Sequence, residues 1–346
     1  MAEPSRNCRM LRIVRMAAAA SAALGLVTLA RAVLPPAPPG VQVTTDYGIE
    51  FVTVGDPGNR PTEAGELQVF PDIRIGEVTQ EFRIARTEIS VEQWIEFVNA
   101  YSPFYSGGIV NPQFTGLGIG WLAGQWVASD PSDWPTVMGW DYAARYCNWL
   151  HNGKATTAEA FESGAYDTST FTYNPDGTSN YQLTHSTDAR FWIPTLDEWT
   201  KAAHWDPALN SGSGGYWYYP ASTNGPLVQG PPDTGGQTNA GPETGPLPVG
   251  SYPSVMSPWG LLDTSGGVRE WTETAHDPFF GTRLTRGSGD STFDPAFSDP
   301  IEFAYAFGPG ATFVGLRVAA VVPAPSVISV WLAALGFTWK RTRSLR

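Results

Sequence analysis

Apolar residues recur along the middle of the chain at two spacings, one typical of strands and the other typical of helices. Residues 44–54 and 72–86 alternate apolar with polar positions, and this alternation predicts strands. Three helices are predicted from their start signals and apolar faces. Two begin at the capping boxes Ser90-Val91-Glu92-Gln93 and Thr195-Leu196-Asp197-Glu198, and the third covers residues 139–150.

Beyond residue 206 the composition changes, because glycine, proline, asparagine and aromatic residues become frequent. This change predicts loops and short strands. The whole chain of 346 residues contains 14 Trp, 37 Gly and 30 Pro, and only 16% of it is charged. Such a chain has ample aromatic surface to bury and is unlike a disordered chain or a helical bundle. No linker or internal repeat divides residues 46–320, so we expect one irregular, loop-rich α+β domain there.

The charge distribution excludes one class of partner. The formal net charge is −12, and nine of the 21 basic residues lie among the first 31 or the last seven positions. The middle of the chain is therefore more acidic than the whole. An acidic surface repels phosphate backbones, so we do not expect a nucleic-acid partner. Cations are the ligands that this charge favours, and an acidic surface that only keeps the protein soluble is the alternative.

Residues 1–32 have the three parts of a secretory signal peptide. Basic residues up to Arg15 precede the apolar run 16–29, and Ala30-Arg31-Ala32 fits a cleavage site. We therefore expect signal peptidase to release a chain that starts with a proline-rich leader at residues 33–45. A retained N-terminal anchor is the alternative.

Residues 321–346 form a second predicted sorting signal. An apolar run at 327–339, which is short for a full membrane span, is followed at once by four basic residues. With the preceding Val-Pro-Ala-Pro, this layout resembles the PEP-CTERM tail of Gram-negative bacteria, although Ala324 stands where that motif usually has glutamate. The resemblance implies an exosortase-type partner, export across the inner membrane, transient anchoring by the tail, and a final place at the cell surface or outside the cell. A plain C-terminal anchor is the alternative.

Six sequence motifs are spread over the predicted domain. They are Arg86-Thr87-Glu88-Ile89-Ser90, Trp140-Asp141-Tyr142-Ala143 with Tyr146-Cys147-Asn148-Trp149-Leu150, the segments 191–203 and 248–272, Arg286-Gly287-Ser288, and Gly315-Leu316-Arg317-Val318-Ala319. In this order they resemble the formylglycine-generating enzyme, or sulfatase-modifying factor, family. The resemblance implies a C-type-lectin-like α+β fold in a single domain.

Active members of that family carry a pair of cysteines, five residues apart, that binds copper and supports the oxidation of a substrate cysteine by oxygen. The matching positions here are about Thr292 and Phe297, and the chain has only Cys8 and Cys147. Thiolates are the ligands that suit Cu(I), so we do not expect copper or the oxidase activity. Cys147 lies in the predicted helix 139–150, where we expect a buried, inert thiol.

The resemblance also implies two calcium sites. The residues on the first family site are Asp263, Gly266, Val268 and Glu270, and those near the second are Asn239 and Ala240. Ca²⁺ takes about six to eight oxygen ligands, which carboxylates and backbone carbonyls of a tight loop can supply. Gly267 and Arg269 depart from the family pattern, which has Asn and Trp there. A Glu270 that is hydrogen-bonded to loop amides without an ion is the alternative.

These observations together predict an exported, non-catalytic relative of the formylglycine-generating enzyme. We expect a calcium-stabilised surface or extracellular binding module whose ligand is a protein or a polysaccharide. One alternative is a divergent oxidase with a rebuilt active site. Another is a structural component of an exported biofilm matrix.

Overall fold

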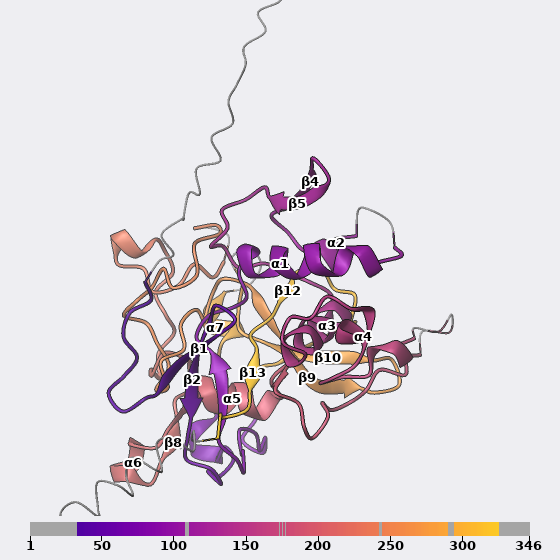
Figure 1. The fold of residues 1–346 in the computed structure, drawn as a ribbon. Helices are drawn as coiled ribbons and strands as arrows, with labels where there is room; N and C mark the ends of the chain where they lie inside the picture. The colour runs from indigo at the N-terminus through magenta and orange to yellow at the C-terminus, as the bar shows by residue number, and fades with distance from the viewer. Residues whose placement is uncertain are drawn as a thin grey trace, which may run out of the picture. The chain divides into compact units, whose positions relative to one another are not determined.

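A computed structural model describes residues 33–324, apart from residues 108–110, 173, 175, 177, 242–243 and 290–293. The predicted signal peptide, the apolar and basic parts of the predicted tail, and Thr292 lie outside the described residues. The described residues belong to one compact unit (Figure 1). Within them, no helix has both the length and the apolar character that a membrane span requires.

The first sheet joins the two ends of the domain. Its five strands lie in the order β1 (Val43–Asp46), β2 (Ile49–Val54), β3 (Phe82–Ala85), β13 (Ala319–Ala320) and β6 (Phe191–Trp192), and neighbouring strands are antiparallel. Figure 1 shows the yellow C-terminal β13 beside the N-terminal strands. The C-terminal motif is therefore a central part of this sheet.

The predicted strands are only partly present. The segment 44–54 forms two strands rather than one, because Tyr47 and Gly48 both have positive φ angles (50° and 80°) and make the hairpin turn. In the segment 72–86 only β3 is a strand. The residues before it form a loop whose backbone groups bond to another loop, as in Thr62 N to Ile75 O at 2.9 Å.

The second sheet carries the residues after the glycine-rich region. Its order is β11 (Tyr305–Phe307), β10 (Thr282–Arg286), β9 (Arg269–Asp277) and β12 (Val314–Gly315), with β12 parallel to β9. Two small hairpins complete the strands: β4 (Ile119–Leu122) with β5 (Gln125–Ala128), and β7 (Trp205–Asp206) with β8 (Gly215–Tyr216).

The three predicted helices are confirmed as α1 (Val91–Tyr101), α3 (Trp140–His151) and α5 (Leu196–His204). Ser90 and Thr195 cap α1 and α5 through the capping boxes. The remaining helical turns are short: α2 (Pro112–Thr115), α4 (Ala158–Glu162), α6 (Leu209–Gly212), α7 (Pro295–Ser298), η1 (Ala64–Glu66), η2 (Ser102–Phe104), η3 (Thr168–Thr170) and η4 (Pro232–Thr234).

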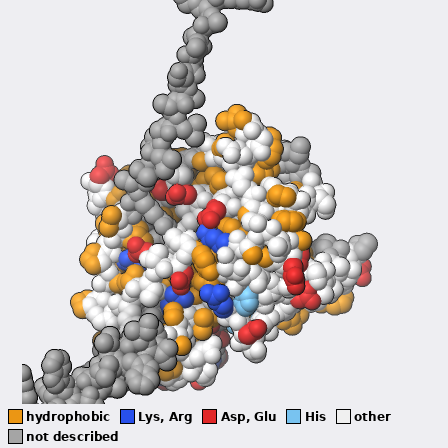
Figure 2. All heavy atoms as spheres, in the orientation of Figure 1, with side chains coloured by type: hydrophobic (Ala, Val, Ile, Leu, Met, Phe, Trp, Pro, Cys, Tyr) orange, Lys and Arg blue, Asp and Glu red, His pale blue; other side chains and the backbone are white. Residues whose placement is uncertain are grey.

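Aromatic side chains fill the space between α1 and α3. Phe97 of α1 packs against Tyr146 and Trp149 of α3, with ring centroids 5.6 and 5.9 Å apart. Trp94 and Cys147 are fully buried in the same cluster. This packing, worth about 0.5–1.5 kcal/mol per ring pair beyond the burial of area, holds irregular loops on a rigid support. On the face drawn in Figure 2, charged side chains are interspersed with apolar ones.

Candidate functional site

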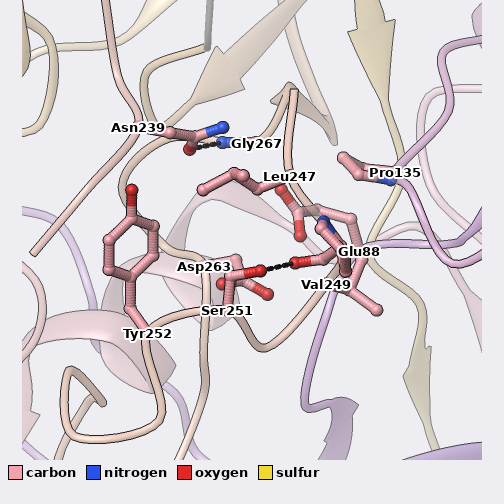
Figure 3. Close-up of a pocket in the computed structure, with 10 residues that line it drawn as sticks. Glu88, Pro135, Asn239, Leu247, Val249, Ser251, Tyr252, Asp263 and Gly267 are labelled. Carbon is pink, nitrogen blue, oxygen red and sulfur yellow. Dashed lines mark hydrogen bonds between the residues drawn. The ribbon is translucent and has the colours of Figure 1, made fainter. Parts of the chain in front are cut away.

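A small acidic pocket lies where the loop before β9 meets the segment between β3 and α1. Its polar lining includes Glu88, Asp263, Asn239 and Gly267, and Figure 3 shows the two carboxylates with the Tyr252 ring across from them. The cavity has a volume of about 10 Å³. That volume suits a single water-sized species, such as a water molecule or a metal ion.

Glu88 is the most unusual residue of this pocket. Its side chain is only 1% exposed. Oε1 accepts a hydrogen bond from Val268 N at 3.1 Å, whereas Oε2 has no hydrogen-bond partner among the described residues. Burial, and next the charge of Asp263, raise the pKa of Glu88 well above its usual value. A buried carboxylate that lacks a partner is costly, so this pocket favours a proton or a cation.

Asp263 is half-buried beside Glu88 and adds a second carboxylate. Its Oδ2 accepts a hydrogen bond from Gly250 N at 2.6 Å, and its backbone has a positive φ of 55°. Burial raises the pKa of Asp263 to about 6, and the charge of Glu270 contributes to the rise. Two neighbouring carboxyl groups with raised pKa values are the electrostatic arrangement that a divalent cation stabilises.

Glu270 lies at the start of β9 and is engaged elsewhere. Its two oxygens accept from the guanidinium of Arg317, at 2.7 Å from Nη2 and 2.9 Å from Nε, and Oε2 also accepts from Trp199 Nε1 at 2.6 Å. Both members of the ion pair are buried, at 0% and 1% exposure. Glu270 is therefore hydrogen-bonded, as in the alternative considered above, although its partners are side chains rather than loop amides. It does not line the acidic pocket.

The two glycines of the loop allow the polar groups to approach. Gly266 and Gly267 have φ angles of 89° and 60°. A Cβ atom at Gly267 would lie 2.0 Å from Glu88 Oε1, so a larger residue would displace that carboxylate. Gly267 N donates to Asn239 Oδ1 at 2.8 Å. Asn239, predicted for a second site, thus lies in the wall of the same pocket as Asp263.

Two of the remaining predicted residues lie beside the pocket. Val268 contacts it through the hydrogen bond from its backbone N–H to Glu88. Ala240 is buried, and its backbone N–H donates to the Thr238 hydroxyl at 3.0 Å. The structure brings together Asp263, Asn239 and the loop glycines, and it adds Glu88, which is not among the predicted ligands. The sequence signal that could have identified Glu88 is a charged residue directly before the apolar Ile89.

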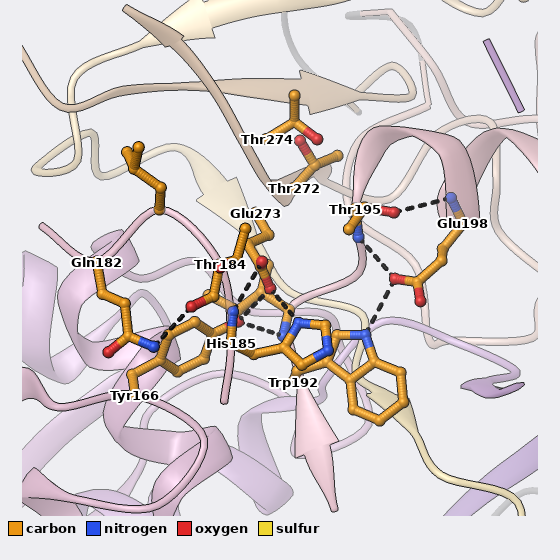
Figure 4. A network of polar contacts seen from close by, with 12 residues as sticks. Tyr166, Gln182, Thr184, His185, Trp192, Thr195, Glu198, Thr272, Glu273 and Thr274 are labelled. Atoms are coloured by element: carbon orange, nitrogen blue, oxygen red, sulfur yellow. Dashed lines mark hydrogen bonds and ion pairs between the residues drawn. The ribbon is translucent and has the colours of Figure 1, made fainter. Parts of the chain in front are cut away.

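A second polar network is centred on Glu273 of β9. Glu273 is buried and accepts hydrogen bonds from Tyr166 Oη at 2.9 Å and from the backbone N–H of His185 at 2.9 Å (Figure 4). The His185 ring stacks on Trp192 at 4.7 Å and lies 2.7 Å from Glu273. Burial alone would lower the pKa of His185, but the hydrogen bond and charge of Glu273 raise it. These contacts tie β9 to β6.

Comparison with known proteins identifies the scaffold. Residues 52–321 match the family described as the sulfatase-modifying factor enzyme 1-like domain. The chain belongs to this family. The match confirms the family resemblance of the motifs and the single, loop-rich α+β domain that they implied.

Individual relatives are distant. Hercynine oxygenase of Mycobacterium tuberculosis (strain ATCC 25618 / H37Rv) is 36% identical over 129 residues, which cover 31% of this chain and 27% of that protein. The similarity thus spans little more than a quarter of the relative's length. The crystal structure of CarF has a TM-score of 0.51 at 20% identity and covers 80% of this chain and 99% of CarF, which shows the fold alone. The structure of PvdO from Pseudomonas aeruginosa has a TM-score of 0.47 at 16% identity.

The family member described here has one cysteine among its described residues. Cys147 lies on α3 and is fully buried, and burial, with the charge of Glu273, raises the pKa of its thiol well above the usual value. A raised pKa disfavours the thiolate that binds metals. Phe297, which the sequence analysis places near one family cysteine, lies on α7 with 68% exposure. Across the described ranges, no three His, Cys, Asp or Glu side chains converge as a metal cluster would.

Proposed function

We propose that this chain is an exported, non-catalytic member of the sulfatase-modifying factor family that acts as a calcium-stabilised binding domain. The observation that most supports the loss of oxidase chemistry is the cysteine inventory. The chain has two cysteines, one in the predicted signal peptide and one buried in α3 with a raised pKa. Neither can form the exposed thiolate pair that copper needs.

Calcium fits the acidic pocket on the chemistry of its oxygens. The unpartnered Oε2 of Glu88 and the carboxylate of Asp263 would supply the negative charge, and Asn239 Oδ1 an amide oxygen. Because only two carboxylates line the pocket, carbonyl oxygens of the loop that contains Gly266 and Val268 would complete the ligand set. When bound, calcium would neutralise the two carboxylates of the pocket and join the loop before β9 to the segment before α1. Glu270 would remain with Arg317.

Export is supported by the ends of the sequence. Residues 1–32 have the layout of a signal peptide, and residues 321–346 that of a sorting tail. Signal peptidase and an exosortase-type enzyme would be the processing partners. The domain would then act at the cell surface or outside the cell, where millimolar calcium permits weak sites to be occupied.

An oxidation assay tests the proposal. The purified full-length chain is supplied with Cu(I), oxygen and a sulfatase-derived peptide that contains the substrate cysteine, and formylglycine is measured by mass spectrometry. The expected result is no more product than in a reaction without protein. The alternative function, a divergent oxidase with a rebuilt site, is favoured by the similarity to hercynine oxygenase, whose name describes an oxygenase. Repeated turnover would establish that alternative, and loss of turnover in Cys147→Ser would locate it.

A further inference from the structure

A larger cavity lies away from the acidic pocket, between α2, the start of α3 and the loop that follows β11. Its volume is about 610 Å³, in the size range of small-molecule sites. Side chains that line it are Gln113, Asp141, Tyr181, Phe307 and Phe313, and the backbone of residues 308–311 completes the wall. Trp140 N donates to Pro309 O at 2.7 Å, and Gly139 N to Gln113 O at 2.9 Å, so all three walls are fixed to the start of α3.

Asp141 is a half-buried residue of this wall, and its carboxylate has spare hydrogen-bonding capacity. Its Oδ2 accepts from Tyr181 Oη at 2.8 Å. Its Oδ1 is buried and has no partner among the described residues. Burial raises the pKa of Asp141, because the carboxylate has lost contact with water and has gained only some of the hydrogen bonds that water would supply. A ligand hydroxyl that donates to Oδ1 would supply a missing hydrogen bond.

Gln113 adds both donors and an acceptor to the same wall. Its side-chain amide makes no hydrogen bond within the described part of the chain, although its backbone is fixed to Gly139. Gly310 leaves room for this amide, because a Cβ atom at Gly310 would lie 2.6 Å from Gln113 Nε2. The cavity therefore offers a carboxylate oxygen and a free amide, a combination that suits a ligand with several hydroxyl groups.

The positive charges near Asp141 disfavour a cationic ligand. The guanidinium groups of Arg145 and Arg283 both act on Asp141 electrostatically, and Arg145 Nη1 donates to Asp141 O at 3.3 Å. Arg283 lies 4.0 Å over the Trp140 ring at the neighbouring position. Both positive charges lower the pKa of Asp141 against the larger effect of burial, although Arg145 is itself paired with Glu162. A cationic ligand would therefore lie beside two arginines. The net charge of −12 disfavours acidic ligands in turn. A neutral ligand satisfies both conditions.

Aromatic rings provide the apolar side of the cavity. Phe313 is 51% exposed and packs edge to face against Phe307 at 4.9 Å between ring centroids. Tyr181 stacks on Trp140, which fixes its ring while its hydroxyl holds Asp141. An exposed aromatic ring beside polar groups suits a ligand with one apolar face and a hydroxylated edge.

We infer that this cavity binds a sugar ring of a neutral polysaccharide. Asp141 and Gln113 bind the hydroxyl groups of the sugar, and Phe307 and Phe313 contact its C–H face. The inference rests on the proposed role of the domain as a binding module and names the ligand class. It uses a site separate from the acidic pocket.

Calorimetric titration of the full-length chain with cellohexaose, maltohexaose and mannohexaose tests the inference. We expect at least one of these neutral oligosaccharides to bind. Asp141→Asn should weaken its binding by roughly tenfold, since one charge-assisted hydrogen bond is worth that factor. Phe313→Ala should also weaken it, because the apolar contact with the C–H face of the sugar is lost. Leu122→Ala, which truncates a 64% exposed apolar residue of β4, is the matched control and should bind as the natural chain does.

The inference is overturned if none of the three sugars binds, or if neither cavity variant weakens the binding. Tetramethylammonium is titrated as a cationic probe, and binding of this cation without binding of any sugar would also overturn the inference. Failure of this site is distinguishable from failure of the proposed function. An absence of sugar binding together with an absence of peptide oxidation rejects the saccharide site and leaves a non-catalytic domain. Peptide oxidation rejects the non-catalytic role whatever the sugars do.

Discussion

Glu270→Gln is expected to lower the free energy of unfolding by about 3–5 kcal/mol. The substitution keeps the size of the side chain but removes the charge that faces Arg317, whose guanidinium is fully buried. The energy lost is chiefly the cost of leaving that guanidinium uncompensated. Arg317 also donates to Ala85 O of β3 and to the backbone oxygens of Leu262 and Asp263. Loss of the Glu270 charge should therefore also weaken the contacts that join β3 to the loop before β9. Urea unfolding followed by tryptophan fluorescence measures the free energy of unfolding.

Glu96→Gln provides the matched control for this prediction. Glu96 pairs with Lys154 at 2.5 Å, but its side chain is 55% exposed. Breaking an exposed pair of this kind costs about 0–1 kcal/mol, because solvent replaces the lost interaction. If Glu270→Gln proves too unstable to purify, Glu270→Met with Arg317→Met should recover much of the stability. Equal effects of Glu270→Gln and Glu96→Gln would show that the buried pair does not have the role assigned to it.

Removal of calcium with EDTA is expected to lower the melting temperature by roughly 5–10 °C. At a calcium concentration a hundredfold above the dissociation constant, binding contributes about 2.7 kcal/mol, and each kcal/mol shifts the melting temperature of a domain of this size by about 2–4 °C. Glu88→Gln should remove the difference between the calcium and EDTA curves, because it neutralises the carboxylate with the unpartnered oxygen. Scanning calorimetry or differential scanning fluorimetry measures the shift.

The effect of pH supplies a second readout for the same pocket. The pKa of Asp263 is raised in the folded state, to about 6. Without calcium, its contribution to stability is therefore full below the ordinary aspartate pKa and is lost as the pH rises through about 6. Calcium should suppress this loss. Glu96→Gln should keep the calcium shift, and Glu270→Gln should also keep it, since Glu270 does not line the pocket. Identical melting curves with and without EDTA would reject the calcium site.

The helices are predicted well because their signals lie close together in the sequence. The helices α1 and α5 were predicted because a capping box and an apolar face lie within a few residues of one another. The strands were predicted poorly, because β6, β12 and β13 have only two residues each and exist through pairing with distant segments. Alternation of apolar and polar residues cannot report such pairing.

The candidate site follows the same division. The sequence predicts Asp263, Gly266 and Val268 together because they share one motif, and of these Asp263 lines the pocket. Glu88 was missed as a ligand because it belongs to a different motif, and only the fold places it beside Asp263. The engagement of Glu270 was missed for the same reason, since its partner Arg317 comes from the last motif of the domain. Asp141 lay within a recognised motif, but its spare oxygen is evident only once Tyr181 and the loop after β11 are in place.

The proposed function requires a calcium ion in the acidic pocket and no bound copper. Elemental analysis of the full-length chain measures both metals, after expression in medium that contains calcium and copper and exhaustive dialysis against metal-free buffer. We expect calcium near one equivalent per chain in the natural sequence, loss of that calcium in Glu88→Gln, and only trace copper in both. Stoichiometric copper without calcium would overturn the proposed function.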